Sequence, residues 1–501
     1  MSESKQTEFN PPIETLQPKA EECAQRLLDA EDVFLASHID ADGIAAASIA
    51  SQALSAAGVK HNINFYKQLD EDHISSIAAT DHETVLFTDF GSGQLDIIAD
   101  YEADGAFTPV ISDHHEPADV ETQYHLNPIL FGISGSSELS GAGTTYCLAR
   151  AMSALQDDPE IDHPTRRADN KDLAGMAIVG AIGDMQGGDS GVQGANTKIV
   201  AEGVEADVLE TNTDLTLYGK QTRPVPKLLE YSTDIRLPGI TGSESGAIEF
   251  LNAQDVDITD DDGDWKHWVD LTTDEKQSIT SGLINVAIES GVPSSRIDNL
   301  IGENYTLPNE PEKTHLRNVG EFSTLLNSTG RYEKCDVGLA VCMGDRNEAY
   351  TAAKTLLQNH QKNISQGIEW VADEGVTKES HIQWFDAGDQ IKETIVGIIA
   401  GMALGEGSID QHTPIIAFAE KSDDESDSGE DDTIDEVKIS SRATRKLTRQ
   451  GLDLSIVMKE ASQHCGGDGG GHDIAAGATI PAENQAEFVE KANEIVKEQT
   501  S

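Results

Sequence analysis

Short apolar runs alternate with helical patterns over the first third of the chain. The apolar runs have the length of strands, and the stretches between them, one of them rich in alanine, have helical periodicity. This repetition of strand, loop and helix predicts a parallel α/β sheet. The expected strands are 33–37, 62–66, 84–88 and 109–112, and the expected helices are 43–57, 139–153 and 171–182.

The end of the chain shows the same alternation of short apolar runs and helical patterns, so we expect a second, smaller α/β domain. The region between, from about 200 to 380, contains helical patterns at 271–289 and 348–360 and an acidic, turn-like run at 255–264. No chemistry is evident there. In the last portion, the expected strands are 414–420, 437–441 and 474–480, and the expected helices are 386–404, 453–462 and 481–498.

An acidic, low-complexity segment at 421–437 interrupts the second domain. Such a composition predicts a surface loop that is too charged to fold. A charged docking segment is the alternative.

Four clusters of acidic and histidine residues follow the apolar runs of the chain. Parallel sheets bind ligands outside the carboxyl ends of their strands, and His38, Asp89 and Asp113 fall at such ends. A single aspartate there is usually a helix cap, but four clusters at the same kind of position favour a joint metal site. Carboxylates and imidazoles without a thiol suit Mn²⁺ or Mg²⁺ better than structural zinc. The clusters span 37–43, 88–91, 112–117 and 180–185.

The chain is strongly acidic, with 89 acidic and 35 basic residues among 501 and a net charge of −54. This balance argues against a polybasic membrane-binding surface and, taken alone, against a nucleic-acid partner. The acids are distributed along the chain, which resembles proteins of haloarchaea. At about 1 M salt the screening length is only about 3 Å, so that self-repulsion is quenched. We therefore expect a halophilic protein.

Five scattered cysteines without a C-x-x-C pair indicate a reducing compartment and no disulfide framework. Residues 1–18 are polar, unlike a signal peptide. The strongest apolar stretches, 173–182 and 395–404, are too short to span a bilayer. We expect a cytoplasmic protein with no membrane contact.

The clusters also resemble a known family. H-x-D-x-D-G at 38–43, D-F-G at 89–91, D-H-H at 113–115 and G-D at 183–184 resemble the four motifs of the DHH phosphoesterases. Within that superfamily the chain looks most like archaeal RecJ-like exonucleases, including the GINS-associated nuclease type. Its later segments resemble the DHHA1 domain, and these segments are 395–400, 414–419, 441–442 and 469–478.

The resemblance implies three regions along the chain. A parallel-sheet DHH domain would occupy 20–240, a middle region of unknown role 241–380, and a smaller α/β DHHA1 domain 381–501.

The resemblance also implies two divalent ions, with Mn²⁺ preferred and Mg²⁺ possible. Asp89 would bridge them, His115 would donate to the phosphate or the leaving oxygen, and Asp113 would orient an imidazole. The other ligands would be His38 and Asp40 for one ion, and Asp42, His114 and Asp184 for the second.

The DHHA1 domain would hold the substrate through Arg442 and the glycine-rich run before His472. Glycines in a turn let backbone N–H groups approach a phosphate, so Gly470 and Gly471 are candidate binding residues; a flexible loop is the alternative. Residues 438–450 contain five basic residues and no acid, which suggests a track for a phosphate backbone or a routine basic helix face. Arg445 and Lys446 belong to this basic island.

These features favour a metal-dependent exonuclease for single-stranded nucleic acid, and the resemblance implies DNA and 5′→3′ polarity. One alternative is a phosphodiesterase for short oligoribonucleotides or cyclic dinucleotides. Another is a scaffold subunit of the replication or repair machinery, with helicase or GINS components as partners. The middle region could serve such docking.

Overall fold

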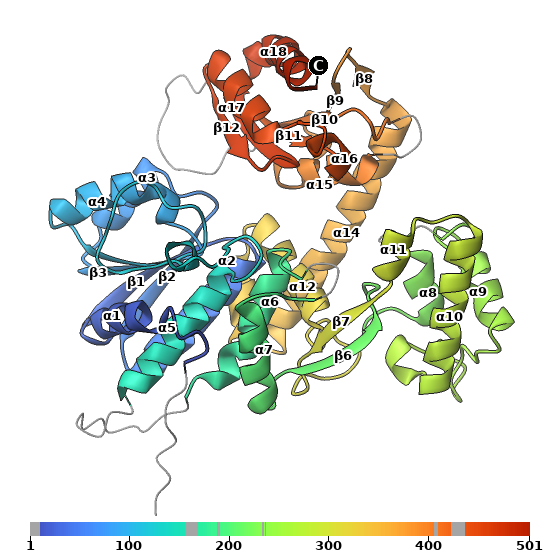
Figure 1. Cartoon of the computed structure of the whole chain (residues 1–501), viewed down its shortest axis with the longest axis horizontal. Coiled ribbons are helices and arrows are strands. Elements are labelled where there is room, and N and C mark those ends of the chain that lie inside the picture. The colour runs from blue at the N-terminus through green and yellow to red at the C-terminus, as the bar shows by residue number, and fades with distance from the viewer. Residues whose placement is uncertain are drawn as a thin grey trace, which may run out of the picture. The chain divides into compact units, whose positions relative to one another are not determined.

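The computed structural model describes residues 11–156, 169–187, 191–232, 235, 237–404, 409–421 and 436–500. The chain divides into two compact units, Met1–Lys354 and Thr355–Ser501, which can be followed by their colours in Figure 1. Most of the acidic segment expected as a loop at 421–437 lies outside the described residues.

A five-stranded parallel sheet forms the centre of the first unit, in the order β2-β1-β3-β4-β5. The predicted fold class is thereby confirmed for this part of the chain. The inner strands β1, β3 and β4 are buried along almost their whole length, as expected for a parallel sheet covered on both faces. The strands are β1 Asp32–His38, β2 Lys60–Tyr66, β3 Thr84–Thr88, β4 Thr108–Ser112 and β5 His125–Leu126.

Helices with small side chains pack closely beside this sheet. In Figure 1, α2 lies next to α5 and α6, and these three helices contact one another. α2 is buried on nearly all sides over its first three turns, because its alanines let the neighbouring helices approach. The helices are α1 Gln17–Leu28, α2 Ala41–Ala57, α3 Glu71–Ala78, α4 Leu95–Ala103, α5 Gly141–Gln156, α6 Ala174–Gly183 and α7 Asn196–Glu205.

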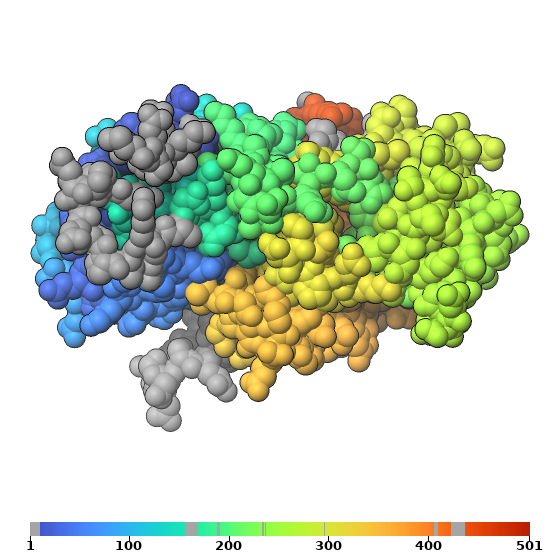
Figure 2. Space-filling model, turned by 90° about the horizontal axis from the view of Figure 1, so that it is seen from below, coloured from blue at the N-terminus to red at the C-terminus, as the bar shows by residue number. Residues whose placement is uncertain are grey.

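The middle region has its own hydrophobic core and is bounded by a pair of strands. Two antiparallel strands, β6 Glu210–Leu215 and β7 Ile301–Thr306, flank a group of helices that pack around Trp268. Figure 2 shows the lime-coloured residues of these helices gathered in one mass. The helices are α8 Val225–Glu230, α9 Glu244–Ala253, α10 Thr273–Glu289 and α11 Ser294–Asp298.

Three helices then follow the inserted group. α12 Val319–Arg331 packs against α2 and α6, and α13 Cys335–Cys342 packs against α2 and α12. α14 Glu348–Glu374 continues from the first unit into the second. The sequence pattern predicted the start of α14 but neither α12 nor α13.

The second unit is a six-stranded mixed sheet in the order β12-β13-β11-β10-β9-β8, in which only β9 and β10 are parallel. Residues of β10 alternate between two cores: Ile416 and Phe418 pack with α17 and α18, while Ile415 packs with α15. Its elements are β8 Thr377–Lys378, β9 Gln383–Asp386, α15 Glu393–Ala403, β10 Ile415–Glu420, β11 Glu436–Arg442, α16 Arg445–Thr448, α17 Leu454–His464, β12 Asp468–Gly471, β13 Ala475–Pro481 and α18 Gln485–Thr500.

Two local predictions in this unit were wrong. The helix expected at 386–404 begins only at Glu393, because β9 pairs with β10 through Asp386 and Gly388 then turns with a positive φ of 50°. The glycine-rich run expected as a turn is the edge strand β12, whose glycines pair with β13. A Cβ on Gly469 would lie 2.8 Å from the Cβ of Ala478, so this strand needs glycine to pair closely.

Candidate metal centre

His38 ends β1, and the loop after it turns at once into α2. Asp40 is the N-cap of α2, and its Oδ1 accepts a hydrogen bond from the Gly43 N–H at 3.0 Å. Its other oxygen, Oδ2, lies 3.2 Å from His38 Nδ1. A Cβ on residue 43 would lie 2.2 Å from the His38 carbonyl oxygen, so the turn requires Gly43. The local sequence thereby directs His38 and Asp40 toward each other.

Asp42 lies in the first turn of α2 and is 1% exposed. Its carboxylate accepts hydrogen bonds from the Ser140 hydroxyl at 2.9 Å and from the N–H groups of Gly141 and Ala142 at 2.7 and 3.0 Å. These groups begin α5, where the helix dipole favours an anion. A Cβ on Gly180 would lie 2.3 Å from Asp42 Oδ1, so α6 also approaches this carboxylate closely.

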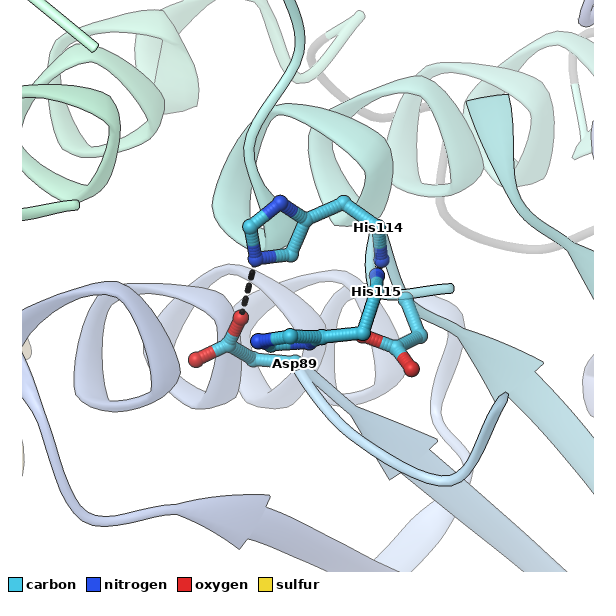
Figure 3. Close-up of side chains that lie close together, drawn as sticks. Asp89, His114 and His115 are labelled. Atoms are coloured by element: carbon cyan, nitrogen blue, oxygen red, sulfur yellow. Dashed lines mark hydrogen bonds and ion pairs between the residues drawn. The ribbon is translucent and has the colours of Figure 1, made fainter. Parts of the chain in front are cut away.

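Asp89 lies between the other ligand candidates at the end of β3. Its φ is +62°, a left-handed conformation that non-glycine residues adopt at a cost. Its Oδ2 lies 3.5 Å from His38 Nδ1, and its Oδ1 lies 3.2 Å from His114 Nε2, the contact drawn in Figure 3. A Cβ on residue 141 would lie 2.3 Å from Asp89 Oδ1, so Gly141 leaves room for this carboxylate.

His114 is buried and held in one orientation. Its Nδ1 donates to the Gly135 carbonyl at 2.7 Å, which leaves Nε2 to face Asp89. The Gln186 side chain donates to the same carbonyl at 2.7 Å and to Asp184 Oδ2 at 2.9 Å. Asp184, which follows α6, lies 3.8 Å from the His114 ring nitrogen Nδ1.

His115 is the exposed member of the group, with 53% of its side chain accessible. Its Nδ1 lies 2.8 Å from Asp113 Oδ1, and a carboxylate in this position accepts the ring proton. Asp113 is fully buried and also accepts from the His114 and Ser92 N–H groups at 2.7 and 2.9 Å. Figure 3 shows the rings of His114 and His115 close to Asp89, and the two ring centres lie 4.3 Å apart.

The carboxylates of this cluster lie so close together that they favour the binding of positive charge. Burial, together with the nearby Asp89 and Asp184, raises the pKa of Asp42 well above its usual value. Burial also raises the pKa of Asp184 to about 6. Burial lowers the pKa of His114, but Asp89 and the other carboxylates outweigh it and raise that pKa well above its usual value. Carboxylates so crowded are stabilised by protons or by cations.

The donor set fits divalent metal ions. Two buried atoms, His38 Nδ1 and Asp89 Oδ1, make no hydrogen bond within the described part of the chain. Their nearest charged partners are other candidate ligands. Oxygen and imidazole donors without a thiol match Mn²⁺ or Mg²⁺. The ligand atoms cluster within 4.8 Å in groups that include His38, Asp40 and Asp89, and Asp42, His114 and Asp184.

The structure therefore brings together all six metal-ligand candidates named from the sequence, with Asp113 and His115 beside them. Several residues that contact the group were missed. Gly135 and Gln186 orient His114 and Asp184, and Ser140 holds Asp42. In the sequence, these residues were marked only by lying between or next to two of the recognised clusters.

Two further missed residues lie on α12. Asn327 accepts a hydrogen bond from the Ala41 N–H at 3.0 Å. Arg331 is near enough to Asp40 for the carboxylate to raise its pKa, although burial, the larger effect, lowers it overall. Nothing in the sequence of the middle region indicated that these residues reach the first cluster.

The substrate-binding candidates lie in the second unit. Arg442 ends β11 opposite Ala475, and the Ala443 N–H donates to the Ile474 carbonyl at 3.0 Å, so the turn that carries His472 lies beside Arg442. A Cβ on Gly397 would lie 2.6 Å from Arg442 Nη2, which places this side chain against α15. Among the substrate-binding candidates, the side chains of His472, Arg445 and Lys446 are exposed, whereas that of Arg442 is half-buried.

Gly470 and Gly471 belong to β12, next to that turn. Gly471 has a φ of +136°, and a Cβ there would meet Ala476 at 2.7 Å. A Cβ on Gly470 would meet nothing within 4 Å. The backbone of Gly470 therefore borders open space.

Three family models match this chain. Residues 32–180 match the DHH family, N-terminal domain, residues 217–301 match the DHH-CID domain, and residues 381–498 match the DHHA1 domain. The boundaries expected from the sequence, 20–240, 241–380 and 381–501, stay a prediction.

Several proteins of known sequence or structure are similar to this chain over most of its length. An uncharacterized protein of Methanocaldococcus jannaschii is 27% identical over 471 residues, covering 92% of this chain and 93% of its own. RecJ of Thermus thermophilus in complex with Mn²⁺ is 14% identical with a TM-score of 0.58, covering 98% of this chain and 56% of its own. Cdc45 of Entamoeba histolytica is 12% identical with a TM-score of 0.60, covering 96% of this chain and 99% of its own.

These structural likenesses establish the fold. The chain spans about half the length of the Thermus RecJ that it matches. None of the helices in the described residues is both long and apolar enough to cross a membrane.

Proposed function

This chain is a RecJ-like DHH/DHHA1 protein with a DHH-CID domain, and from that premise we propose that it is a metal-dependent exonuclease acting on single-stranded nucleic acid. The observation that carries the proposal is Asp89, whose two carboxylate oxygens face His38 on one side and His114 on the other. A carboxylate that directs one oxygen toward each group of candidate ligands can contact two ions at once. The neighbouring solved structures named RecJ were obtained with manganese or magnesium.

When bound, two divalent ions supply an activated water and a clamp on the phosphodiester. The protein groups prepare this chemistry. Asp40 and His38 face Asp89 from one side, and Asp42, His114 and Asp184 from the other, so the candidate ligands already lie close together. His115, whose Nδ1–H donates a hydrogen bond to Asp113, can present Nε2 to the phosphate or to the leaving oxygen. Arg331, beside Asp40, adds a positive charge to the same side.

The second unit would hold the strand. Arg442 and His472 would contact the phosphate near the end that is cut, and Arg445 and Lys446 would follow the backbone of a long strand. DNA as substrate and 5′→3′ polarity complete the proposal, and their support is the resemblance of the four motifs to RecJ-like exonucleases. At high salt the release of counterions contributes little to binding, so hydrogen bonds and metal contacts would carry more of the affinity.

The test is digestion of DNA and RNA labelled at either end, single- and double-stranded, with Mn²⁺, Mg²⁺ or EDTA. We expect mononucleotides released progressively from the 5′ end of single-stranded DNA, with Mn²⁺ the better ion and no reaction in EDTA. Activity that persists in EDTA would contradict the metal centre. Cleavage restricted to dinucleotides or cyclic dinucleotides would instead identify the small-substrate phosphodiesterase.

A scaffold role is the second candidate, and the likeness to Cdc45 favours it. The partners would be components of the replicative helicase, including GINS, and the inserted helices at 217–301 are the proposed docking site. A pull-down comparing the full chain with a variant lacking the helices α8 to α11, residues 225–298, tests this role and keeps the contacts of Gln221 and Thr222 with α12. Loss of partner capture with nuclease activity retained would support it, whereas unchanged capture would contradict it.

His115→Ala is expected to lower the rate of hydrolysis by about 10²–10⁴-fold, the usual contribution of a positioned proton donor. Binding of Mn²⁺ should stay close to that of the parent, because His115 is the exposed ring and the ligand candidates remain. The measurement is single-turnover cleavage together with metal content by mass spectrometry. A matched control is His73→Ala, which removes a half-buried histidine paired with an aspartate, Asp70, from α3. Loss of metal in the His115 variant would make it a ligand instead.

Gly470→Ala offers a sharp test of the substrate surface. A Cβ at this position meets no protein atom within 4 Å, so the fold should tolerate it. If a phosphate lies against this backbone, binding of single strands should weaken. His472→Ala and Arg442→Ala should each weaken binding by about ten- to hundredfold, the equivalent of about 1.5–3 kcal/mol for a charged hydrogen bond.

Arg445→Ala distinguishes contacts along the backbone of a long strand from contacts at the end that is cut. It should weaken binding of long strands and leave cleavage of a dinucleotide unchanged, while His472→Ala affects both. Metal content measured by mass spectrometry should match the parent in all four variants. Parent-like affinity of every variant for long strands would refute the assignment of this surface.

A further inference from the structure

The loop between Asp40 and Asp42 is held by a helix from the middle region. Asn327 on α12 accepts a hydrogen bond from the Ala41 N–H at 3.0 Å, across 286 positions of sequence. Ala41 is the first residue of α2, and the N–H groups that begin a helix have no partner within it. Asn327 therefore satisfies a backbone donor that lies directly between two of the candidate ligands.

α12 also approaches this loop with its backbone. A Cβ on Gly330 would lie 1.9 Å from the Ile39 carbonyl oxygen, so only glycine allows this contact. The thiol of Cys335, at the start of α13, lies 3.7 Å from the same carbonyl. The turn from residue 39 to residue 41 is thereby fixed by contacts on both its carbonyl and its N–H side.

α12 itself is anchored at its other end. Glu321, which is 1% exposed, accepts hydrogen bonds from the Gln221 N–H at 2.9 Å and from the Thr222 hydroxyl at 2.6 Å. These residues lie at the start of the inserted region, after β6. Packing against α2 and α6 completes the support. Asn327 thus stands on an element whose position is determined by the surrounding fold.

We propose that Asn327 is a positioning residue for the metal centre, setting the separation and direction of the Asp40 and Asp42 carboxylates through the Ala41 N–H. The inference rests on the proposed two-ion site. Without the acceptor, the buried N–H loses its partner and the turn can relax, so that ordering the ligands becomes part of the cost of binding metal. Residues that support metal ligands typically change affinity by about 10–100-fold when they are replaced.

Three variants of the full chain test this role. Asn327→Leu keeps the size of the side chain and removes the acceptor, and Asn327→Asp keeps an acceptor oxygen. Asn318→Ala is the matched control, because Asn318 caps the other end of α12 by accepting from the Glu321 N–H at 3.1 Å. The measurements are hydrogen–deuterium exchange of peptides covering 38–44 in the metal-free protein and Mn²⁺ affinity by calorimetry.

Asn327→Leu should exchange faster in the 38–44 peptides and bind Mn²⁺ about tenfold more weakly. Asn327→Asp should retain slow exchange and bind at least as tightly as the parent. Asn318→Ala should lower the melting temperature without changing either measurement. The proposal is overturned if the leucine variant matches the parent in both, or if Asn318→Ala weakens Mn²⁺ binding as much. Failure of the parent to bind Mn²⁺ would instead refute the two-ion site, and the exchange data would still report whether Asn327 holds the loop.

Discussion

Asp89→Asn is expected to abolish hydrolysis, with a loss of at least about a thousandfold, equivalent to about 4 kcal/mol in the activation barrier. Asp89 is the one carboxylate that faces both groups of candidate ligands, so its loss affects both ions. Asparagine keeps the size of the side chain and tolerates the left-handed backbone at this position, whereas alanine pays for it in strain.

The same variant should leave the metal-free fold intact, because it removes repulsion toward Asp42 and Asp184 together with attraction toward His38 and His114. The charge of Asp89 raises the pKa of Asp42 and of Asp184, which reflects repulsion that the substitution removes. A bound metal stabilises the parent by about 2.7 kcal/mol when its concentration is a hundred times the dissociation constant. That stabilisation should be lost in the variant.

The measurements are cleavage of single-stranded DNA, metal content, and melting temperature with and without Mn²⁺. Asp100→Asn, on an exposed position of α4, is the charge-matched control and should behave like the parent. Near-normal Mn²⁺-dependent cleavage by Asp89→Asn would disprove the assignment of Asp89 as a shared ligand.

The second large effect concerns salt. We expect a cooperative melt at about 2 M KCl and loss of structure on dilution to about 0.1 M, where the screening length grows from under about 3 Å to about 10 Å. Even if each of the 35 basic residues paired with a different acid, 89 − 35 = 54 carboxylates would have no such partner. Their mutual repulsion opposes the compact state unless salt screens it.

Circular dichroism melts at the two concentrations measure this effect. Repeating them with choline chloride at equal ionic strength distinguishes general screening from a specific requirement for potassium. Identical melts at low and high salt would refute the halophilic interpretation. Nuclease assays belong in the same buffers, because an unfolded chain would otherwise be mistaken for an inactive one.

Periodicity located the parallel sheet because each of its inner strands is a continuous apolar run of the right length. β3 was predicted with its observed bounds, and β1 and β4 within one residue at each end. The candidate site followed from the same pattern, since residues after such strands meet at one edge of the sheet. Asp184 was the exception, because it follows the helix α6 and was found from its motif.

The contacts that hold the site were not predictable in this way. Asn327 reaches Ala41 through tertiary packing alone, and no local pattern reports a partner 286 positions away. The strand β12 was missed because a run of glycines has no side chains to alternate between faces. The start of α15 was misplaced because the pairing of β9 with β10 overrides local helical periodicity.

The hydrogen bonds of Asp42 bear on how such a site could decay in evolution. A lineage that no longer needed catalysis could replace Asp89 by asparagine or glycine, which tolerate the left-handed backbone and relieve the repulsion toward Asp42. Losing Asp42 would leave the Ser140 hydroxyl and two N–H groups at the start of α5 buried without an acceptor. Inactive descendants of this fold should therefore retain the aspartate at position 42 long after the one at position 89 has changed, so an intact H-x-D-x-D-G motif alone is a poor indicator of surviving activity.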